Sequence, residues 1–270
     1  MNNIAIAHET IKITGLGEYR IGEDTVQLPK TDYDSVTVIT PDSAKNLLEE
    51  PLTAEQRDTA CSIEVTTEDT FSAAQRIGNA LVLNFANAHH AGGGFMLGAN
   101  AQEEALCRCS TLYASITSAA ASEMYRYNNT HLSATESDYM LLSQEVCVFR
   151  DHHCELLKEP FTAAVITAPA PNRRGAAVFA SQKTLEETFL RRSAIILRTA
   201  VQYGYRNLVL GAWGCGAFGN DPDLVADCFR RALAQDDLMM YFDTVCFAVY
   251  GSENSKNYRA FQAVFGNSAK

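Results

Sequence analysis

Two adjacent carboxyl groups, Glu103 and Glu104, stand where they could do acid–base chemistry on a sugar. A carboxylic acid can protonate the leaving oxygen of a glycosidic bond, and the resulting carboxylate can then deprotonate the attacking water. Neighbouring helical residues point about 100° apart, so we expect the two acids to have different roles. The alternative is structural, because acids in the first turn of a helix complement its dipole.

A run of three glycines precedes these acids, and seven residues separate it from Gln102. The order is Gly92, Gly93, Gly94, a spacer, and then Gln102 followed by the two acids. Consecutive glycines permit positive φ angles and leave no side chain between the backbone and a ligand. Such a loop can place its amides along a diphosphate or a sugar, although a flexible turn would have the same composition.

A second glycine-rich loop follows a candidate strand that ends at Leu210. Its glycines are Gly211, Gly214, Gly216 and Gly219, and a helix is expected to begin after Asn220 or Asp221. A glycine loop that leads into a helix N-terminus is a typical phosphate site. The loop lacks the Gly-Lys-Ser/Thr ending of a Walker motif and is no clean dinucleotide fingerprint. Phe218 could stack on a sugar or cover the loop itself.

Two other strand exits carry polar side chains. Asp69 is expected to cap a helix, and it could equally accept a hydrogen bond from a ligand amino group. Arg173 and Arg174 follow a turn fixed by two prolines, and they could face phosphate or simply be solvated. In open α/β sheets, ligands collect beyond the carboxyl ends of the strands, where all these exits would lie.

Strand and helix patterns alternate along the chain, which predicts a three-layer α/β/α sandwich with a largely parallel or mixed central sheet. The predicted strands are 36–40, 63–66, 80–85, 146–149, 163–167, 207–210 and 244–249. The predicted helices are 70–77, 103–118, 185–203, 221–234 and 257–265. Residues 1–58 are more acidic and less regular, so we predict an N-terminal extension there and one catalytic domain over 59–270.

Composition excludes several classes of protein. The chain has 270 residues, 47% hydrophobic and 20% charged, as in an ordinary globular protein. The net charge of −10 argues against general nucleic-acid binding and against anionic membranes. No apolar run approaches the length of about 18 residues that a spanning helix needs, and no signal peptide is evident, so we expect a cytoplasmic protein.

Eight cysteines raise the question of a metal site. Cys107 and Cys109 are two residues apart, and the run from His152 to Cys154 is a suggestive cluster. The spacing matches no common zinc pattern, and most cysteines lie in apolar segments where the thiol acts as a small hydrophobe. We therefore predict free thiols, with no metal.

The triple glycine, the seven-residue spacer and the Gln-Glu-Glu triplet together resemble the signature of poly(ADP-ribose) glycohydrolases. The segments VLNFANA, CRCSTLY and LGAWGCGAFGN resemble the microbial-type branch of that family, and the similarity covers about residues 60–250. The resemblance implies a macrodomain-like fold, a mixed sheet between helices that binds ADP-ribose. It implies no cofactor. The N-terminal residues have no counterpart in this resemblance.

The resemblance also implies roles for single residues. Glu104 would be the catalytic acid/base, while Glu103 and Gln102 would orient Glu104 and the ribose hydroxyls. Asn87 and the triple glycine would hold the terminal ribose and its phosphate, and Asp69 would meet the adenine amino group. The second loop would wrap the diphosphate, with Phe218 against the ribose; its expected binding residues are Gly214, Cys215, Gly216, Ala217, Phe218 and Gly219.

Four functions are compatible with these observations. The first is an exo-acting hydrolase that cleaves ribose–ribose bonds of poly(ADP-ribose) and releases ADP-ribose. The second removes mono-ADP-ribose from protein or nucleic acid. The third is a non-catalytic ADP-ribose-binding macrodomain, and the fourth a generic nucleotide-sugar binder. The expected partner is ADP-ribose or its polymer on a modified protein, and the intact acid pair favours the enzymes over the binding proteins.

Overall fold

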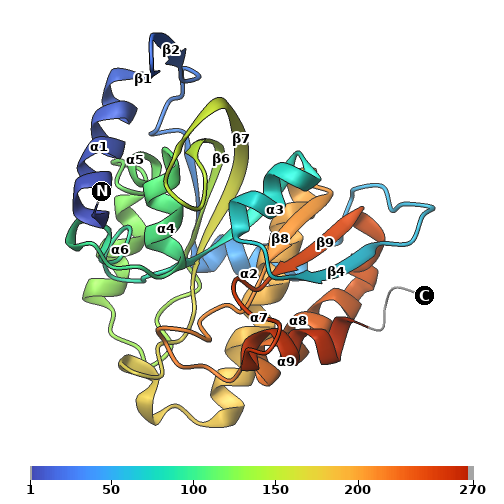
Figure 1. Ribbon diagram of the computed structural model, residues 1–270. Coiled ribbons are helices and arrows are strands. Elements are labelled where there is room, and N and C mark those ends of the chain that lie inside the picture. The colour runs from blue at the N-terminus through green and yellow to red at the C-terminus, as the bar shows by residue number, and fades with distance from the viewer. Residues whose placement is uncertain (1, 267–270) are drawn as a thin grey trace.

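The computed structural model describes residues 2–266, which form a seven-stranded mixed sheet between two layers of helices (Figure 1). The strands lie in the order β3-β6-β7-β5-β8-β9-β4, and β6 runs antiparallel to both of its neighbours. The sheet strands are β3 (Val36–Ile39), β4 (Ser62–Thr66), β5 (Ala80–Ala86), β6 (Met140–Arg150), β7 (Leu156–Pro169), β8 (Asn207–Leu210) and β9 (Thr244–Ala248). The predicted fold class is confirmed.

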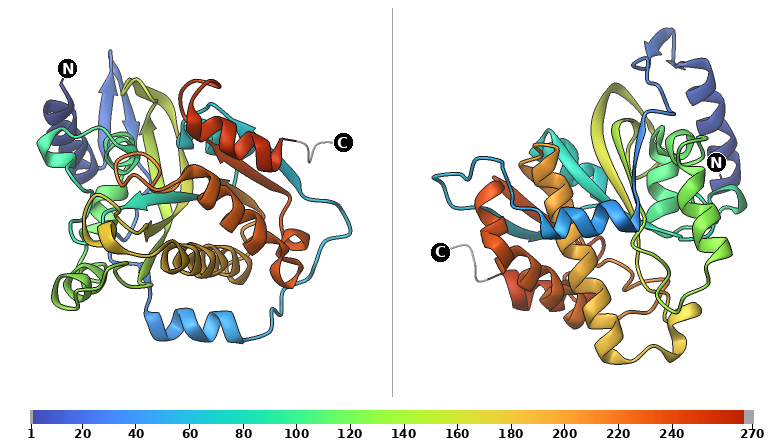
Figure 2. Two further views of the ribbon diagram at one scale, coloured as in Figure 1. Left: turned by 90° about the horizontal axis from the view of Figure 1, so that it is seen from below. Right: turned by 180° about the vertical axis from the view of Figure 1, so that it is seen from behind.

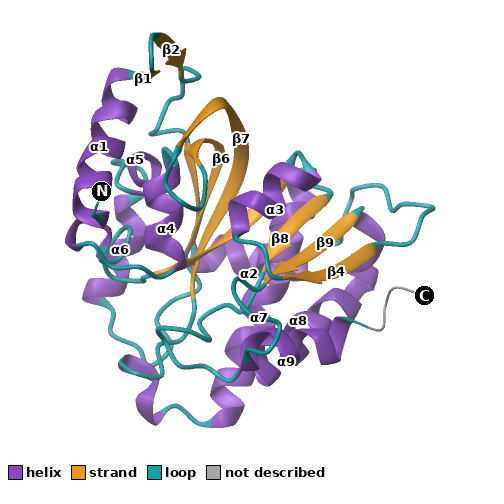
Figure 3. Cartoon of the chain, in the orientation of Figure 1, coloured by secondary structure: helices purple, strands orange, loops and turns teal. Residues whose placement is uncertain are grey.

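Helices cover both faces of the sheet (Figures 2 and 3). Side chains of one face pack with α1 (Asn3–Leu16), α3 (Thr70–Ile77), α4 (Gln102–Cys109), α5 (Leu112–Ile116) and α6 (Ser122–Thr130). Those of the other face pack with α2 (Pro41–Glu49), α7 (Gln182–Gln202), α8 (Pro222–Ala234) and α9 (Lys256–Phe265). Successive residues of β5 alternate between these two cores, as the pleat of a strand requires.

Short elements complete the chain. A hairpin of β1 (Glu18–Ile21) and β2 (Asp24–Gln27) extends from the end of α1. The 3-10 helices are η1 (Phe95–Leu97), η2 (Ala176–Phe179) and η3 (Gln235–Tyr241). No helix in residues 2–266 is long and apolar enough to span a bilayer.

Local signals explain several helix boundaries. The Asp69 carboxylate accepts the Phe71 N–H at 3.0 Å and caps α3. Pro222 occupies the first turn of α8, where its missing N–H costs nothing. After α7 the chain turns at Gly204 with φ +74°.

The single helix predicted over 103–118 is wrong. The chain leaves the helical conformation at Ser110, whose φ of −149° and ψ of 179° are extended. Ser110 forms a β-bridge with Val148, and the Thr111 hydroxyl accepts the Cys147 N–H at 3.0 Å. Pairing with the neighbouring strand therefore overrides the helical spacing of the apolar residues and separates α4 from α5.

Residues 1–58 contain more regular structure than their sequence indicated. They form α1, the β1–β2 hairpin, β3 and α2, and β3 pairs with β6 at the edge of the main sheet. Sequence analysis missed α1 because its isoleucines and threonines are β-branched and favour strands. Packing against η1 and α4 stabilises the helix instead. The domain boundary at residue 58 stays a prediction.

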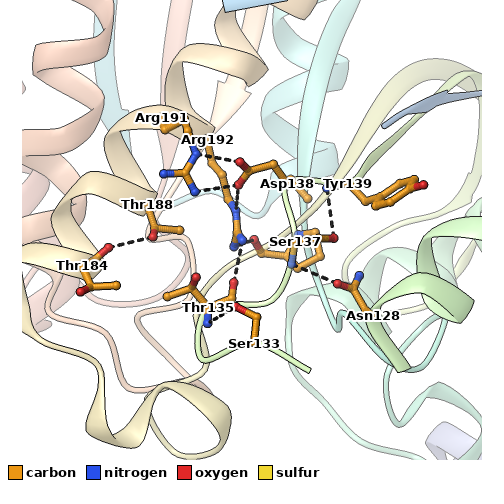
Figure 4. A network of polar contacts seen from close by, with 12 residues as sticks. Asn128, Ser133, Thr135, Ser137, Asp138, Tyr139, Thr184, Thr188, Arg191 and Arg192 are labelled. Carbon is orange, nitrogen blue, oxygen red and sulfur yellow. Dashed lines mark hydrogen bonds and ion pairs between the residues drawn. The ribbon is translucent and has the colours of Figure 1, made fainter. Parts of the chain in front are cut away.

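A buried arginine joins α7 to the rest of the fold (Figure 4). The Arg192 side chain, which is fully buried, donates to the Asp138 carboxylate at 2.8 Å, to the Pro169 carbonyl at 3.0 Å and to the Thr135 carbonyl at 2.6 Å. Arg191 donates to the same carboxylate at 2.7 Å. Burial favours the neutral form of Asp138, yet the two guanidiniums hold its pKa below the usual value.

We predict that Asp138→Ala destabilises the protein by about 3 kcal/mol at neutral pH, because it leaves a buried guanidinium without its counter-ion. The matched control is Asp227→Ala, which removes an exposed partner of Arg230 and should cost less than about 1 kcal/mol. Urea unfolding measures both. Since the pKa of Asp138 is lowered, its contribution should persist at neutral pH and disappear as the pH falls through that pKa. Equal losses in the two variants would contradict the argument.

Candidate active site

A cleft of about 780 Å³ lies beyond the carboxyl ends of the parallel strands. Segments that follow β4, β5, β8 and β9 all reach it, which is the expected place for a ligand in such a sheet. The predicted site residues that line it are Asp69, Asn87, Gln102, Glu103, Glu104, Gly214, Gly216, Ala217 and Phe218. Within residues 2–266, Gly92, Gly93, Gly94, Cys215 and Gly219 are not among its lining residues.

Glu104 completes the start of α4 and also lines the cleft. Its carboxylate accepts the Gly94 N–H and the Ala101 N–H, each at 2.9 Å. Ala101 is the N-cap residue of α4, so this acid completes the helix start. The side chain also lines the cleft while only 7% of the residue is exposed. The hydrogen bonds therefore fix a carboxylate at the wall of the cleft.

Glu103 lies deeper and is only 3% exposed. Its carboxyl accepts the Asn87 N–H at 2.8 Å and lies 3.4 Å from the Asn84 amide nitrogen. Burial raises the pKa of Glu103, the Asn87 N–H opposes this, and the neighbouring Glu104 adds to it, so that the pKa is about 8. At neutral pH the chain thus holds a neutral carboxyl at Glu103.

Gln102 connects α4 to β5 rather than facing only the cleft. Its carbonyl oxygen accepts the Phe85 N–H at 2.9 Å, and its amide donates to the Leu83 carbonyl at 2.8 Å. The ladder between β5 and β8 ends at Val82, so these bonds satisfy backbone groups beyond the paired region. The same amide also donates to the Thr70 hydroxyl at 3.1 Å. Because both of its N–H donors are used within the chain, Gln102 positions the start of α4.

The triple glycine packs against the carboxyl pair. Gly93 has φ +55°, and a Cβ there would lie 2.6 Å from Glu104 Oε1 and 3.2 Å from Glu103 Oε2. A Cβ on Gly94 would lie 2.7 Å from that of Ala99. The glycines therefore let the backbone approach the two carboxyl groups, a structural need that the sequence interpretation did not include.

The second glycine loop forms another part of the cleft wall. The Asn220 amide closes it by donating to the Pro171 carbonyl at 2.7 Å and to the Gly214 carbonyl at 3.1 Å. Gly214 has φ +72° and no room for a side chain, because a Cβ would lie 2.7 Å from the Asn220 amide. Phe218 is half-buried against the core and lines the cleft. The loop leads directly into the N-terminus of α8.

Two further predicted residues lie at the cleft with part of their polar groups engaged. The Asn87 side-chain oxygen accepts the N–H groups of His89 and His90, so its amide nitrogen is the end that we expect to face a ligand. Asp69 accepts backbone N–H groups as the cap of α3, and one of its oxygens lies 3.9 Å from the His152 ring. Arg173 and Arg174 do not line the cleft.

Sequence analysis missed the residues that hold the loop before α4. Asn3 and Ile6 of α1 line the cleft, and the Asn3 amide donates to the Gly98 carbonyl at 3.1 Å. Arg108 is buried and donates to the Ala99 carbonyl at 2.6 Å and to the Asn100 side chain at 2.5 Å. The sequence could have indicated Arg108, because it is a charged residue inside an apolar helical pattern. No comparable signal indicated that α1 reaches the cleft.

The cysteine and histidine cluster does not build a metal centre in the described part of the chain. No group of three or more His, Cys, Asp and Glu side chains is arranged there to hold an ion. All eight cysteines are free thiols.

The raised pKa of Glu103 has a consequence for stability. Since the folded value is about 8 and the usual value is 4.5, folding binds a proton between these pH values, and stability falls as the pH rises through that window. We predict that Glu103→Gln, which copies the neutral form, removes this fall and makes the protein more stable than the parent at pH 8. Urea unfolding at pH 5 and pH 8 measures it; a parent that is equally stable at both values would contradict the assignment.

Comparisons with known proteins agree with this geometry. Residues 7–151 match the family described as microbial-type PARG, catalytic domain. A poly(ADP-ribose) glycohydrolase structure from Thermomonospora curvata is 37% identical, covers 97% of this chain and 99% of its own, and superposes with a TM-score of 0.90. A comparison with curated proteins gives no match.

Two further similar structures contain ligands. The Thermomonospora curvata enzyme bound to the inhibitor ADP-HPD is 36% identical over 97% of this chain and 99% of its own, with a TM-score of 0.85. A poly(ADP-ribose) glycohydrolase from Deinococcus radiodurans in complex with ADP-ribose is 36% identical over 91% of this chain and 100% of its own, with a TM-score of 0.81. By both the family match and these identities, the chain belongs to the microbial-type poly(ADP-ribose) glycohydrolase family.

Proposed function

We propose that the protein hydrolyses the ribose–ribose O-glycosidic bonds of poly(ADP-ribose) from the chain end and releases ADP-ribose. The observation that carries this proposal is the Glu104 carboxyl, which two backbone N–H groups fix at the wall of a cleft shared with the second glycine loop. The family and the ligands of its similar structures supply the substrate class.

Glu104 acts as the acid and then as the base. In the first step its carboxyl gives a proton to the oxygen that leaves the anomeric carbon, and the sugar passes through an oxocarbenium-like state. The carboxylate then takes a proton from the attacking water, which restores the acid. Two fixed N–H donors hold the group in one position through both steps, which saves orientation entropy at the transition state.

Glu103 acts beside it as a neutral carboxyl. A buried neutral group can donate a hydrogen bond to a ribose hydroxyl and adds no negative charge near the anionic diphosphate. Gln102 is a positioning residue, because its amide sets the distance between α4 and β5. This division of roles fits the expectation that two adjacent acids differ.

The remaining cleft residues bind the rest of the ligand. The second loop, with Gly214, Gly216 and Ala217 at the cleft, leads into the α8 N-terminus and offers backbone N–H groups to the diphosphate. Phe218 packs against the terminal ribose, and Asn87 donates to its hydroxyls. Asp69 lies at another part of the cleft lining, where a carboxylate oxygen can accept the adenine amino group.

A protein that only binds ADP-ribose would have little use for this acid pair. Burying two adjacent carboxyl groups costs free energy, and an ionised carboxyl group opposes an anionic ligand. An enzyme in which one carboxyl exchanges a proton with the substrate has a reason to bear this free-energy cost. Removal of mono-ADP-ribose from a modified protein needs the same chemistry and stays the second candidate.

We predict that Glu104→Gln lowers turnover of poly(ADP-ribose) by about 100-fold or more, because the amide cannot give up a proton. Binding of ADP-ribose, measured by calorimetry, should survive, since the amide oxygen still accepts a hydrogen bond. Glu136→Gln is the control: this glutamate is also buried but does not line the cleft, so its turnover should stay near that of the parent. Unchanged turnover in Glu104→Gln would place the chemistry elsewhere.

We predict that Gly93→Ala lowers turnover by about 100-fold, because its Cβ would displace the Glu104 carboxyl by a large fraction of an ångström. Gly204→Ala is a matched control, since Gly204 also has a positive φ but has nothing within 4 Å of an added Cβ. Both variants should lose about 1 kcal/mol of stability from the strained backbone, and only the first should lose activity. Equal activities would remove the glycine from the site.

Products of an automodified polymerase separate the candidate functions. Release of free ADP-ribose, with the bond between the protein and its first ADP-ribose left intact, indicates exo-acting cleavage. A fully stripped protein indicates removal of mono-ADP-ribose, and no change indicates a binding protein. We expect the first result, and we expect EDTA to leave the rate unchanged because no step needs a metal. A cytoplasmic location is part of this proposal.

A further inference from the structure

Two cysteines meet at the side of the cleft that Asp69 also lines. Cys109 is the last residue of α4, and Cys154 lies in the turn between β6 and β7. The Cys109 thiol lies 3.1 Å from the Asp151 carbonyl oxygen, which also accepts the Cys154 N–H at 2.9 Å. The Cys154 side chain also packs against the apolar cluster that contains Cys109, so the two thiols are neighbours. Both residues line the cleft.

The surroundings of Cys154 favour its thiolate. The neighbouring Cys109 thiol, together with the guanidiniums of Arg108 and Arg150, lowers the pKa of Cys154, although partial burial opposes them. Cys154 is partly exposed, whereas Cys109 is buried and its pKa is raised. An exposed thiolate beside a buried thiol is the arrangement of a peroxide-reactive cysteine and its resolving partner.

The backbone at Cys154 is also unusual. Its φ is +65°, a left-handed conformation that a residue with a Cβ adopts only where its surroundings hold it. The Arg150 side chain donates to the Cys154 carbonyl at 2.8 Å, and Asp151 accepts the N–H groups of His153 and Glu155 at 2.9 Å. The turn therefore holds Cys154 beside the end of α4 at the cost of backbone strain.

We propose that Cys109 and Cys154 form a reversible disulfide when the protein meets hydrogen peroxide, and that this modification weakens ligand binding in the cleft. The Cys154 thiolate attacks one peroxide oxygen, the O–O bond breaks, and a sulfenic acid and hydroxide form. The Cys109 thiol then attacks that sulfur, the S–O bond breaks, and water leaves. In total, two thiols and one peroxide give one disulfide and two waters.

The disulfide acts on the cleft through two contacts. It draws the 151–154 turn toward α4, and His152 of this turn lies 3.9 Å from the Asp69 carboxylate. It also removes a thiolate charge that interacts with Arg108, whose guanidinium holds the loop before α4. Both changes displace groups that line the cleft. The effect on binding rests on the proposed function, whereas formation of the disulfide does not.

Peptide mapping tests the bond directly. Trypsin places Cys107, Cys109, Cys147 and Cys154 on four separate peptides, because an arginine lies between each neighbouring pair. After treatment of the native protein with peroxide near stoichiometry, we expect one linked pair, 109–126 with 151–158, which dithiothreitol separates. Cys109→Ser and Cys154→Ser should each abolish it, and Cys61→Ser, which changes a partly exposed thiol elsewhere, should retain it.

Calorimetry with ADP-ribose tests the consequence. We expect the oxidised protein to bind about tenfold more weakly, the effect of losing one hydrogen bond to a charged group, and to recover with dithiothreitol. Absence of the linked peptides, or a loss of affinity that persists in the double serine variant, overturns the proposal. If the reduced protein does not bind ADP-ribose, the proposed function fails while the peptide map still decides the disulfide.

Discussion

Two carboxyl groups are buried side by side at the first turn of α4. The surrounding groups of the site offset the free-energy cost of burying them. Gly94 and Ala101 direct backbone N–H groups at Glu104, and Asn87 directs one at Glu103. Burial and mutual repulsion leave Glu103 neutral, so the pair carries less charge than two exposed acids. The glycine loop fits because these oxygens occupy the space of its absent side chains.

The sheet fixes the distance across the cleft. The parallel strands β5, β8 and β9 end at one edge, so Asn87, the second glycine loop and the segment after β9 reach the same space. Gln102 extends the hydrogen bonding of β5 where its ladder to β8 stops. The sheet, rather than a loop, therefore positions the carboxyl pair.

Motifs at the strand ends predicted the cleft, because parallel strands and glycine-rich turns leave clear patterns. The predicted members Asp69, Asn87, Glu104 and Phe218 all line it, although their roles stay proposals. What could not be predicted depends on contacts between distant segments. The extended residue at Ser110 follows from pairing with Val148, and no local pattern encodes that pairing.

The part played by α1 has a practical side. Its first turn carries Asn3, which lines the cleft and anchors the loop before α4, whereas α9 ends at Phe265, away from α1 (Figure 1). A purification handle or fluorescent reporter fused ahead of this helix would sit beside the mouth where a bulky polymer must enter. Attachment at the opposite terminus leaves that approach open and is the better choice for immobilised assays.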